Sequence, residues 1–508
     1  MQFTEIGFAV FLLIVFCLYW FALRKTIWLR NLMVLSASYI FYGWWDWRFL
    51  ILIVITTLST FGSALFIPRR HGKVFLVANI VLNLGILAVF KYLGFFTENL
   101  QRLFSLFGWN LDWFTIDVLL PVGISFYTFQ AIAYSIDVYR KNVKPERNII
   151  TFATFIAYFP QLVAGPIERA AQLLPQLRTA RPWERDYAVS GLRMILFGVL
   201  KKVAVADILA VYVDEIFNEG NLANPLIVLA AGLLFSLQIY CDFSAYSEIA
   251  RGTSRLLGIE LMANFRFPYF SRNIMEFWRR WHISLMMWFR DYLYIPMGGN
   301  RKGKARTYLN IAVVFLLSGL WHGAAWNFIV WGAYWALANI IGRAFMHLKV
   351  PGKAIGFGDL PKIVETFMVV AFGFYIFRCE TWQQMAQGFM SLPLYYTALA
   401  FLWFVALIIT CKPFRTLYSC ISLRWALGVL AVAAIIGTGI WQWQLCLRYF
   451  FVLPALFVFV LEWHGRNGDY PFATLCANRY GRWILYWVSM LFVVLSEPLD
   501  MSFIYFQF

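Results

Sequence analysis

The sequence predicts an all-α polytopic membrane protein, and two observations carry that prediction. Of the 508 residues, 61% are hydrophobic and only 14% are charged. Apolar stretches at or near membrane-spanning length recur along the whole chain, among them 6–23, 49–67, 74–89, 394–410 and 426–440. Because about 20 apolar residues cross the hydrocarbon core of a bilayer, we expect about 11 to 13 transmembrane or re-entrant helices.

Basic residues beside the first apolar stretch set the expected topology. None precedes that stretch, whereas Arg24, Lys25 and Arg30 follow it, so the positive-inside rule places the N-terminus outside the cytoplasm. Arg482 precedes the last apolar helix, which places the C-terminus outside as well. The first stretch has neither a basic leader nor a small-residue cleavage site, and it is therefore expected to remain as a helix.

No soluble domain is expected, because the longest polar stretch, 168–186, is too short to form one. We predict one membrane domain over residues 1–500 and a short tail over residues 501–508. The net charge of +17 lies mostly in short loops beside helix ends, which favours contact with anionic membrane lipids over nucleic acid. The seven cysteines show no metal-binding spacing, so no metal site is expected.

His322 is an ionisable residue within an otherwise apolar stretch. It lies in the apolar run 316–326, and an ionisable side chain at membrane depth is costly unless it faces the protein interior or a water-filled cavity. Its neighbours one helical turn earlier, Ser318 and Gly319, are small. Either another helix packs closely against this gap, or a substrate reaches His322 as a general base, with Ser318 fixing the imidazole tautomer.

His282 follows a segment that begins like a helix, since Asn273 precedes Glu276 by three residues in the pattern of a capping box. The segment alternates arginines with large apolar residues, as interfacial or re-entrant helices do. One interpretation is a lipid-facing anchor in which His282 is simply solvated. The other is a cytoplasmic vestibule, where His282 orients a phosphate-bearing donor that is bound by Arg279, Arg280 and Arg290.

Two carboxylates, Asp242 and Glu248, interrupt an otherwise apolar stretch. Each costs about 2.5 to 3.5 kcal/mol at bilayer depth on insertion scales, so partners are expected. Arg251 lies one helical turn after Glu248 and is a candidate partner. Together with Tyr246, these residues are expected to lock the helices that shape a cavity.

A further polar segment, 161–169, predicts a helix that breaks at Gly165-Pro166 and lines a cavity or ends at an interface. The sequence contains no Gly-rich phosphate loop, nucleophile elbow or HExxH zinc motif. A mechanism of the soluble-enzyme kind is therefore not indicated.

Several of these stretches together resemble the membrane-bound O-acyltransferase (MBOAT) family. The most specific are FWRRWHISLMMWFRDYLYIPMGGNR at 277–301 and SGLWHGAAWNF at 318–328, which includes Asn327. The similarity is to the bacterial branch of alginate O-acetylation, peptidoglycan O-acetylation and teichoic acid D-alanyl transfer. It implies a ring of helices around a thin centre, with funnels from both faces that meet near His322.

The resemblance also implies an activity. An activated donor, for which acetyl-CoA is expected, delivers an acetyl group from the cytoplasm, and a glycan such as peptidoglycan or alginate is O-acetylated outside a bacterial inner membrane. His322 matches the family's histidine in the membrane interior, and His282 matches its second histidine. No bound cofactor is implied, and a separate periplasmic acetyltransferase is the expected protein partner.

The C-terminal sequence FIYFQF at 503–508 resembles the FxYF tail of a small partner peptide in D-alanylation systems. In those systems a C-terminal tyrosine is proposed to carry the acyl group, so the resemblance implies that Tyr505 is an acyl acceptor or relay. A terminal aromatic cluster is also typical of the interfacial belt of membrane proteins.

Other functions stay open at this stage. A channel or secondary transporter would move an acyl donor or a glycan without making a bond, with the histidines as a proton relay. D-alanyl transfer to a teichoic acid is the alternative within the same family. A scaffold for other acyltransferases would need no base at His322.

Overall fold

The structure is a computed structural model, which describes residues 1–23, 26–109, 120–219, 222–346, 348–352, 354–410, 452–468, 479–496 and 503–504. Within these ranges the regular structure is entirely helical. Among the described residues, four helical stretches are long and apolar enough to cross a bilayer, namely Ile27–Phe66, Gly72–Leu106, Pro225–Leu256 and Phe357–Arg378. The predicted all-α polytopic fold is confirmed. The predicted stretch 426–440 and the basic pair Arg24 and Lys25 lie outside the described residues.

The N-terminal helices are α1 (Ile6–Cys17), α2 (Ile27–Asp46), α3 (Leu50–Phe66), α4 (Gly72–Leu87) and α5 (Leu93–Leu106). The central helices are α6 (Ile124–Tyr139), α7 (Ile149–Ala157), α8 (Phe159–Leu162), α9 (Ala170–Arg178), α10 (Arg185–Lys201), α11 (Asp207–Glu219), α12 (Pro225–Leu256), α13 (Ile274–Arg280), α14 (Ile283–Phe289), α15 (Gly303–His322) and α16 (Trp326–Ala344). The C-terminal helices are α17 (Leu360–Arg378), α18 (Trp382–Met390), α19 (Leu392–Thr410), α23 (Val452–Gly465) and α24 (Arg479–Leu495).

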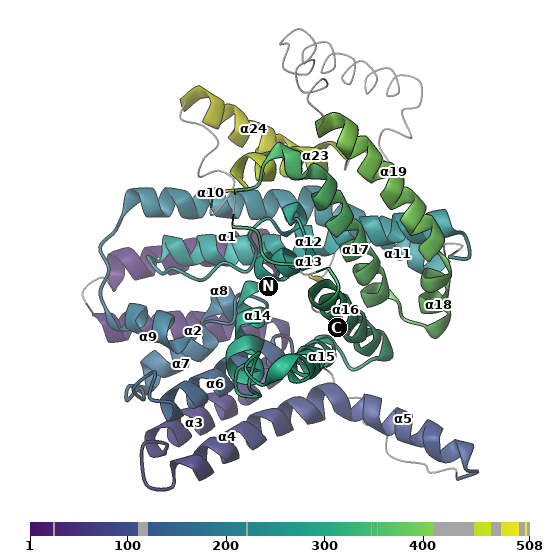
Figure 1. Ribbon diagram of the computed structural model, residues 1–508. Coiled ribbons are helices and arrows are strands. Elements are labelled where there is room, and N and C mark those ends of the chain that lie inside the picture. The colour runs from purple at the N-terminus through teal and green to yellow at the C-terminus, as the bar shows by residue number, and fades with distance from the viewer. Residues whose placement is uncertain are drawn as a thin grey trace.

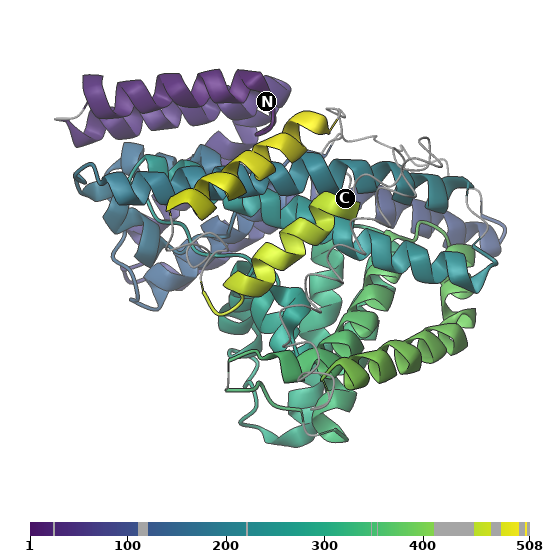
Figure 2. The same ribbon diagram turned by 90° about the horizontal axis from the view of Figure 1, so that it is seen from above.

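Short helical turns extend or join these helices. Wider π-helical turns lie at Leu18–Ala22, Ala88–Tyr92, Lys202–Ala206 and Arg290–Tyr294. Tighter 3-10 turns lie at Trp47–Phe49, Pro268–Phe270 and Phe357–Asp359. In Figure 2, α1 and α2 form a layer along one face, and the green segments near residues 350–400 extend toward the opposite side.

The helix α12, with 32 residues, is the spine of the fold. Asn224 caps its first turn by accepting a hydrogen bond from the N–H of Leu226 at 3.0 Å, and Pro225 occupies a position where no N–H donor is needed. α10 runs along α12, and α11 and α17 also pack against it (Figure 1). The approach of α10 requires glycine, because a Cβ on Gly191 would come within 2.6 Å of the backbone oxygen of Gly252.

The helices α15 and α16 form a tight hairpin that places His322 at its turn. A Cβ on Gly319 would collide with the backbone oxygen of Phe328, and a Cβ on Gly332 would come within 2.6 Å of the backbone oxygen of Phe315. The small residues before His322 therefore serve close helix packing. Of the two interpretations of the gap, helix packing is the one that Gly319 supports.

The segment from Asn273 forms two short helices, α13 and α14, where the sequence suggested one mixed helix. Asn273 caps α13 as predicted, since its Oδ1 accepts from the N–H of Glu276 at 2.9 Å. The reciprocal half of the capping box is replaced, because the Glu276 carboxylate accepts from the backbone N–H of Arg272 at 3.0 Å. The break predicted at Gly165-Pro166 is present, between the end of α8 and the start of α9.

Candidate active site

His322 is the last residue of α15, and its side chain is buried. Its imidazole contacts the rings of Trp331 on α16 and Phe377 on α17, with centroid distances of 5.2 Å and 5.3 Å. Gly323 follows with an extended backbone, so the helix ends at the histidine itself. α15 thus delivers His322 to the place where α16 and α17 also meet.

Two side chains from the N-terminal helices hold the carbonyl end of α15. Lys91 Nζ donates to the backbone oxygens of Trp321 and His322, each at 2.8 Å, and the Tyr92 hydroxyl donates to that of Leu320 at 2.7 Å. A cation is favourable there because the last carbonyl groups of a helix lack partners within it. Sequence reasoning missed Lys91, although a lysine within an apolar membrane stretch was a usable signal.

His282 joins α13 to α14 and lies in the same core. Its backbone is left-handed, with a φ of 43°, which is uncommon for residues other than glycine. The side chain is 1% exposed, and the ring centroids of Phe243 and Trp321 lie 4.8 Å and 5.8 Å from its own. The interpretation of His282 as a solvated, lipid-facing anchor is therefore wrong.

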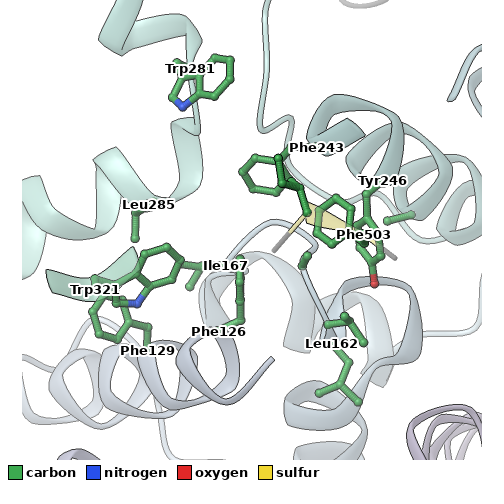
Figure 3. Close-up of a cluster of buried hydrophobic side chains, with 14 of the residues drawn as sticks. Phe126, Phe129, Leu162, Ile167, Phe243, Tyr246, Trp281, Leu285, Trp321 and Phe503 are labelled. Carbon is green, nitrogen blue, oxygen red and sulfur yellow. The ribbon is translucent and has the colours of Figure 1, made fainter. Parts of the chain in front are cut away.

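The two histidines lie side by side although they come from separate elements, with 6.5 Å between their ring centroids. Phe126 and Trp321 flank the pair, and Figure 3 shows these rings in the surrounding cluster. The enclosure is mostly aromatic, so it keeps bulk water away from the imidazoles. Two such imidazoles can take up and release protons during a group transfer.

Hydrogen bonds fix the turn that carries His282. The N–H of Ile283 donates to the backbone oxygen of Asn264 at 2.9 Å, and Ser284 Oγ donates to Asn264 Oδ1 at 2.6 Å. Ser284 Oγ also accepts from the N–H of Ile167 at 3.1 Å. The turn is therefore tied to the segment just after the Gly165-Pro166 break.

The three arginines expected to bind a donor do not stay together. Arg279 and Arg290 line a cavity of about 560 Å³, and Arg343 from α16 joins them. Arg280 instead forms an ion pair with Glu276, at 2.8 Å. A cavity with guanidinium groups at its wall suits phosphates and other anionic groups. Sequence reasoning missed Arg343, because only the fold brings the end of α16 beside α13.

Aromatic rings separate this cavity from the histidines. Trp278 lines the cavity and contacts Trp331 at 5.9 Å between centroids, and Trp331 in turn contacts His322. A second cavity of about 30 Å³ touches His322 directly and is also lined by Lys91 and Ser125. It has room for about one or two water molecules, so a substrate must displace side chains to reach His322.

Glu248 finds a partner that the sequence did not suggest. Its Oε1 lies 3.1 Å from Nζ of Lys201, which also pairs with Glu462 at 2.6 Å. The expected pairing with Arg251 is wrong, because Arg251 extends to Glu260, at 2.8 Å. The three-residue spacing favours Arg251, but the cation that pairs with Glu248 comes from the end of α10.

Asp242 and Tyr246 lie where the C-terminal segment returns to the core. Asp242 Oδ1 is 2.7 Å from Lys202 Nζ, and its Oδ2 accepts from the N–H of Ile504 at 2.7 Å. The ring of Phe503 contacts that of Tyr246, with a centroid distance of 4.9 Å, and Figure 3 shows the two rings together. Tyr505 lies outside the described residues.

Ser318 and Asn327 belong to the framework of the α15–α16 hairpin. Ser318 is buried one turn before His322. Asn327 Nδ2 donates to the backbone oxygen of Phe377 at 2.8 Å, which ties the start of α16 to the end of α17. Within the ranges that the structure describes, no group of three or more His, Cys, Asp and Glu side chains is placed to hold a metal ion.

Comparisons with known proteins identify the family. The family model described as "MBOAT, membrane-bound O-acyltransferase family" matches residues 143–350. A Pseudomonas putida protein named "Probable alginate O-acetylase" is 42% identical over 357 residues, which cover 69% of this chain and 72% of that protein. The peptidoglycan O-acetyltransferase of Helicobacter pylori is 32% identical over 383 residues, covering 69% of this chain and 71% of the relative.

The teichoic acid D-alanyltransferase of Bacillus subtilis is more distant, at 30% identity over 272 residues, which cover 50% of this chain and 68% of the relative. The family resemblance inferred from the sequence motifs is thereby confirmed. His282, His322 and the cavity arginines Arg279, Arg290 and Arg343 all fall inside the matched range. The chain therefore belongs to the membrane-bound O-acyltransferase family, and it is an O-acyltransferase.

Proposed function

We propose that the chain moves an acetyl group across a bacterial inner membrane and O-acetylates a glycan on the far side, either peptidoglycan or an exopolysaccharide such as alginate. The observation that carries the proposal is the burial of His282 and His322 beside each other, with ring centroids 6.5 Å apart. The acceptor class is supported by the relatives, which are named for alginate and peptidoglycan O-acetylation.

Acetyl-CoA is the proposed donor, and the cavity of about 560 Å³ is its proposed site. The donor carries several phosphate charges, and the guanidinium groups of Arg279, Arg290 and Arg343 complement them. Its thioester arm would reach the histidines past Trp278 and Trp331, whose rings lie between the cavity and His322. Rotation of these side chains would therefore gate the transfer.

In the proposed chemistry His322 acts as general base. It takes the proton of an acceptor hydroxyl while the hydroxyl oxygen attacks the thioester carbonyl carbon. A carbon–oxygen bond forms and the carbon–sulfur bond breaks, and the CoA sulfur leaves with the proton that His322 releases. His282 is proposed to orient the reacting groups, and Asp242, Tyr246 and Glu248 hold the surrounding helices.

Tyr505 is the proposed first acceptor. A phenol has an ordinary pKa near 10, so a neighbouring base would help it attack. The burial of Phe503 and Ile504 supports this role, because it brings the chain into the core immediately before Tyr505. A periplasmic acetyltransferase partner, or the enzyme itself, would then move the acetyl group from the tyrosine ester to a glycan hydroxyl.

Both termini are proposed to lie outside the cytoplasm. The rings of Phe3 and Phe503 each contact that of Tyr246, with centroid distances of 4.6 Å and 4.9 Å. Two chain ends that meet at one side chain are most simply explained if both enter the fold from the same side. Their meeting supports a common location, and the basic residues of the first loop support the outer side.

The test uses purified protein and acetyl-CoA with a labelled acetyl group. Wild-type protein should release CoA thiol and acquire label. Thiol release should be lost in His322→Ala, and label on the protein should be lost in Tyr505→Phe. The exposed residues His71 and Tyr480 provide matched controls, since His71→Ala and Tyr480→Phe should behave as wild type.

The same assay separates the alternatives. Label and thiol release that persist in both His322→Ala and Tyr505→Phe would overturn the proposed mechanism. A transporter would release no thiol from acetyl-CoA in the wild type. A D-alanyl transferase would label itself from a D-alanyl carrier and remain unlabelled with acetyl-CoA.

A further inference from the structure

The C-terminal segment is docked through its backbone as well as through its side chains. The N–H of Ile504 donates to Asp242 Oδ2 at 2.7 Å, and both residues are buried. Asp242 lies near the middle of α12, which is a candidate membrane span. A hydrogen bond to an ionised carboxylate is stronger than one between neutral groups, so this contact is suited to hold a chain end in place.

The carboxylate that receives the segment is itself held by a lysine. Lys202 Nζ is 2.7 Å from Asp242 Oδ1 and also 2.7 Å from Asp207 Oδ1. Lys202 thus lies between two buried carboxylates, of which Asp242 bonds to Ile504. Asp207, at the start of α11, contacts the same lysine. Substitution of Asp207 is therefore a control for substitution of Asp242.

Aromatic rings form the rest of the docking site. Phe503 contacts Tyr246 and Phe243, with centroid distances of 4.9 Å and 6.0 Å. Phe3, from the N-terminus, contacts Tyr246 as well. Phe243 also contacts His282, at 4.8 Å. A single ring therefore separates the docked segment from the histidine pair.

We infer that Asp242, oriented by Lys202, is a positioning residue that anchors the chain's own C-terminal segment in the core. The bound segment is residues 503 and 504, which contribute the aromatic ring of Phe503 and the backbone N–H of Ile504. An anchor at residues 503 and 504 would hold the proposed acyl relay, Tyr505, next to a fixed point of the core. Only this use of the anchor rests on the proposed function. Docking itself is measured without any acyl transfer.

The test places a photoreactive benzophenone amino acid at position 503 of the full-length protein in membranes. Irradiation should cross-link position 503 to the 240–248 segment, which contains Phe243 and Tyr246, and mass spectrometry would locate the link. In Asp242→Asn the cross-link should fall severalfold, because the amide lacks the charge that strengthens the bond to Ile504. Asp207→Asn should keep the cross-link, because Asp207 holds the same lysine at a different place.

A second pair of variants protects the test against misfolding of the core. Ile504→Pro removes the N–H donor in the tail itself and should also lose the cross-link, whereas Ile504→Val keeps the donor and the link. Equal cross-linking in wild type, Asp242→Asn and Ile504→Pro would overturn the inference, and so would an equal loss in Asp207→Asn and Asp242→Asn. The link should persist in His322→Ala, so failure of acyl transfer and failure of docking remain distinguishable.

Discussion

Two groups of ionisable side chains lie in the core, and their neighbours differ in kind. One is the histidine pair, and the other is the lysine–carboxylate cluster of Lys201, Glu248 and Glu462. Lys201 lies between Glu248 and Glu462, at 3.1 Å and 2.6 Å, so opposite charges compensate one another. His282 and His322 are instead surrounded by aromatic rings, including those of Phe243 and Trp331. Lys201 thereby ties α10 to Glu248 of α12 and to Glu462 of α23.

The difference suggests which substitutions disturb the fold and which disturb the chemistry. Breaking a buried ion pair leaves a charge without compensation, which is strongly destabilising. Replacing a histidine by a neutral polar side chain leaves no such charge behind. Substitutions in the two clusters should therefore separate stability from activity.

The largest effect is expected from His322→Gln, which keeps a polar side chain of similar size. Ester acetate on the acceptor glycan, measured in cells after mild alkaline release, should fall by a factor of about 100 to 10,000, the usual contribution of a general base. The purified variant should unfold thermally close to wild type. Full acetylation in this variant would remove His322 from the chemistry.

Lys201→Met should lower the stability of the fold. The change leaves the buried Glu462 and the partly buried Glu248 without their cation, at a cost of about 3 to 5 kcal/mol. Thermal unfolding in detergent would show the loss as a lower melting temperature. Arg48→Met is the matched control, since solvent screens the exposed Arg48–Asp46 pair and its loss should leave the melting temperature unchanged. Equal melting temperatures in the two variants would contradict this account of the cluster.

Gly319→Ala tests how tightly the α15–α16 hairpin holds His322. The added Cβ would collide with the backbone oxygen of Phe328, so the hairpin must open. Forced overpacking of this kind costs about 1 to 3 kcal/mol, and the melting temperature should fall accordingly. Gly62→Ala, in α3, is the control because a Cβ there meets nothing within 4 Å. A loss of stability in both variants would point to backbone effects unrelated to the hairpin.

Arg343→Ala should have the smallest effect, on donor binding alone. Loss of one charge-assisted contact is expected to raise KM for acetyl-CoA by about tenfold. The value of kcat should be unchanged, because such a contact holds donor and transition state equally. Initial-rate kinetics would measure both constants, with Arg301→Ala in an exposed loop as control. An unchanged KM would exclude Arg343 from the donor site.

The fold class and the two histidines could be predicted, because composition and local motifs carry them. Apolar runs of spanning length indicate a membrane protein whatever the topology, and His322 stands out as an ionisable residue in such a run. Whether His282 lies in a lipid-facing anchor or in a vestibule does not follow from its own segment. Its burial depends on Phe243 and Trp321, which belong to other elements.

Sequence reasoning did not predict which residues pair with the buried polar and charged side chains. Lys91 reaches the end of α15 from a position 231 residues away from His322, and Lys201 reaches Glu462 from another helix. Helical spacing predicts only neighbours one turn apart, which is why Arg251 was expected beside Glu248. Contacts between distant helices depend on packing, so only the structure gives them.

We expect His282 and His322 to carry the chemistry, and Lys201 with its two glutamates to carry the fold. The most direct measurement is CoA thiol release from acetyl-CoA per folded molecule, with the folded fraction determined on the same sample by size-exclusion chromatography. Lys201→Met should give few folded molecules that each retain near wild-type turnover, and His322→Gln should give many folded molecules with almost none. The reverse pattern, with active His322→Gln and folded but inactive Lys201→Met, would contradict the account.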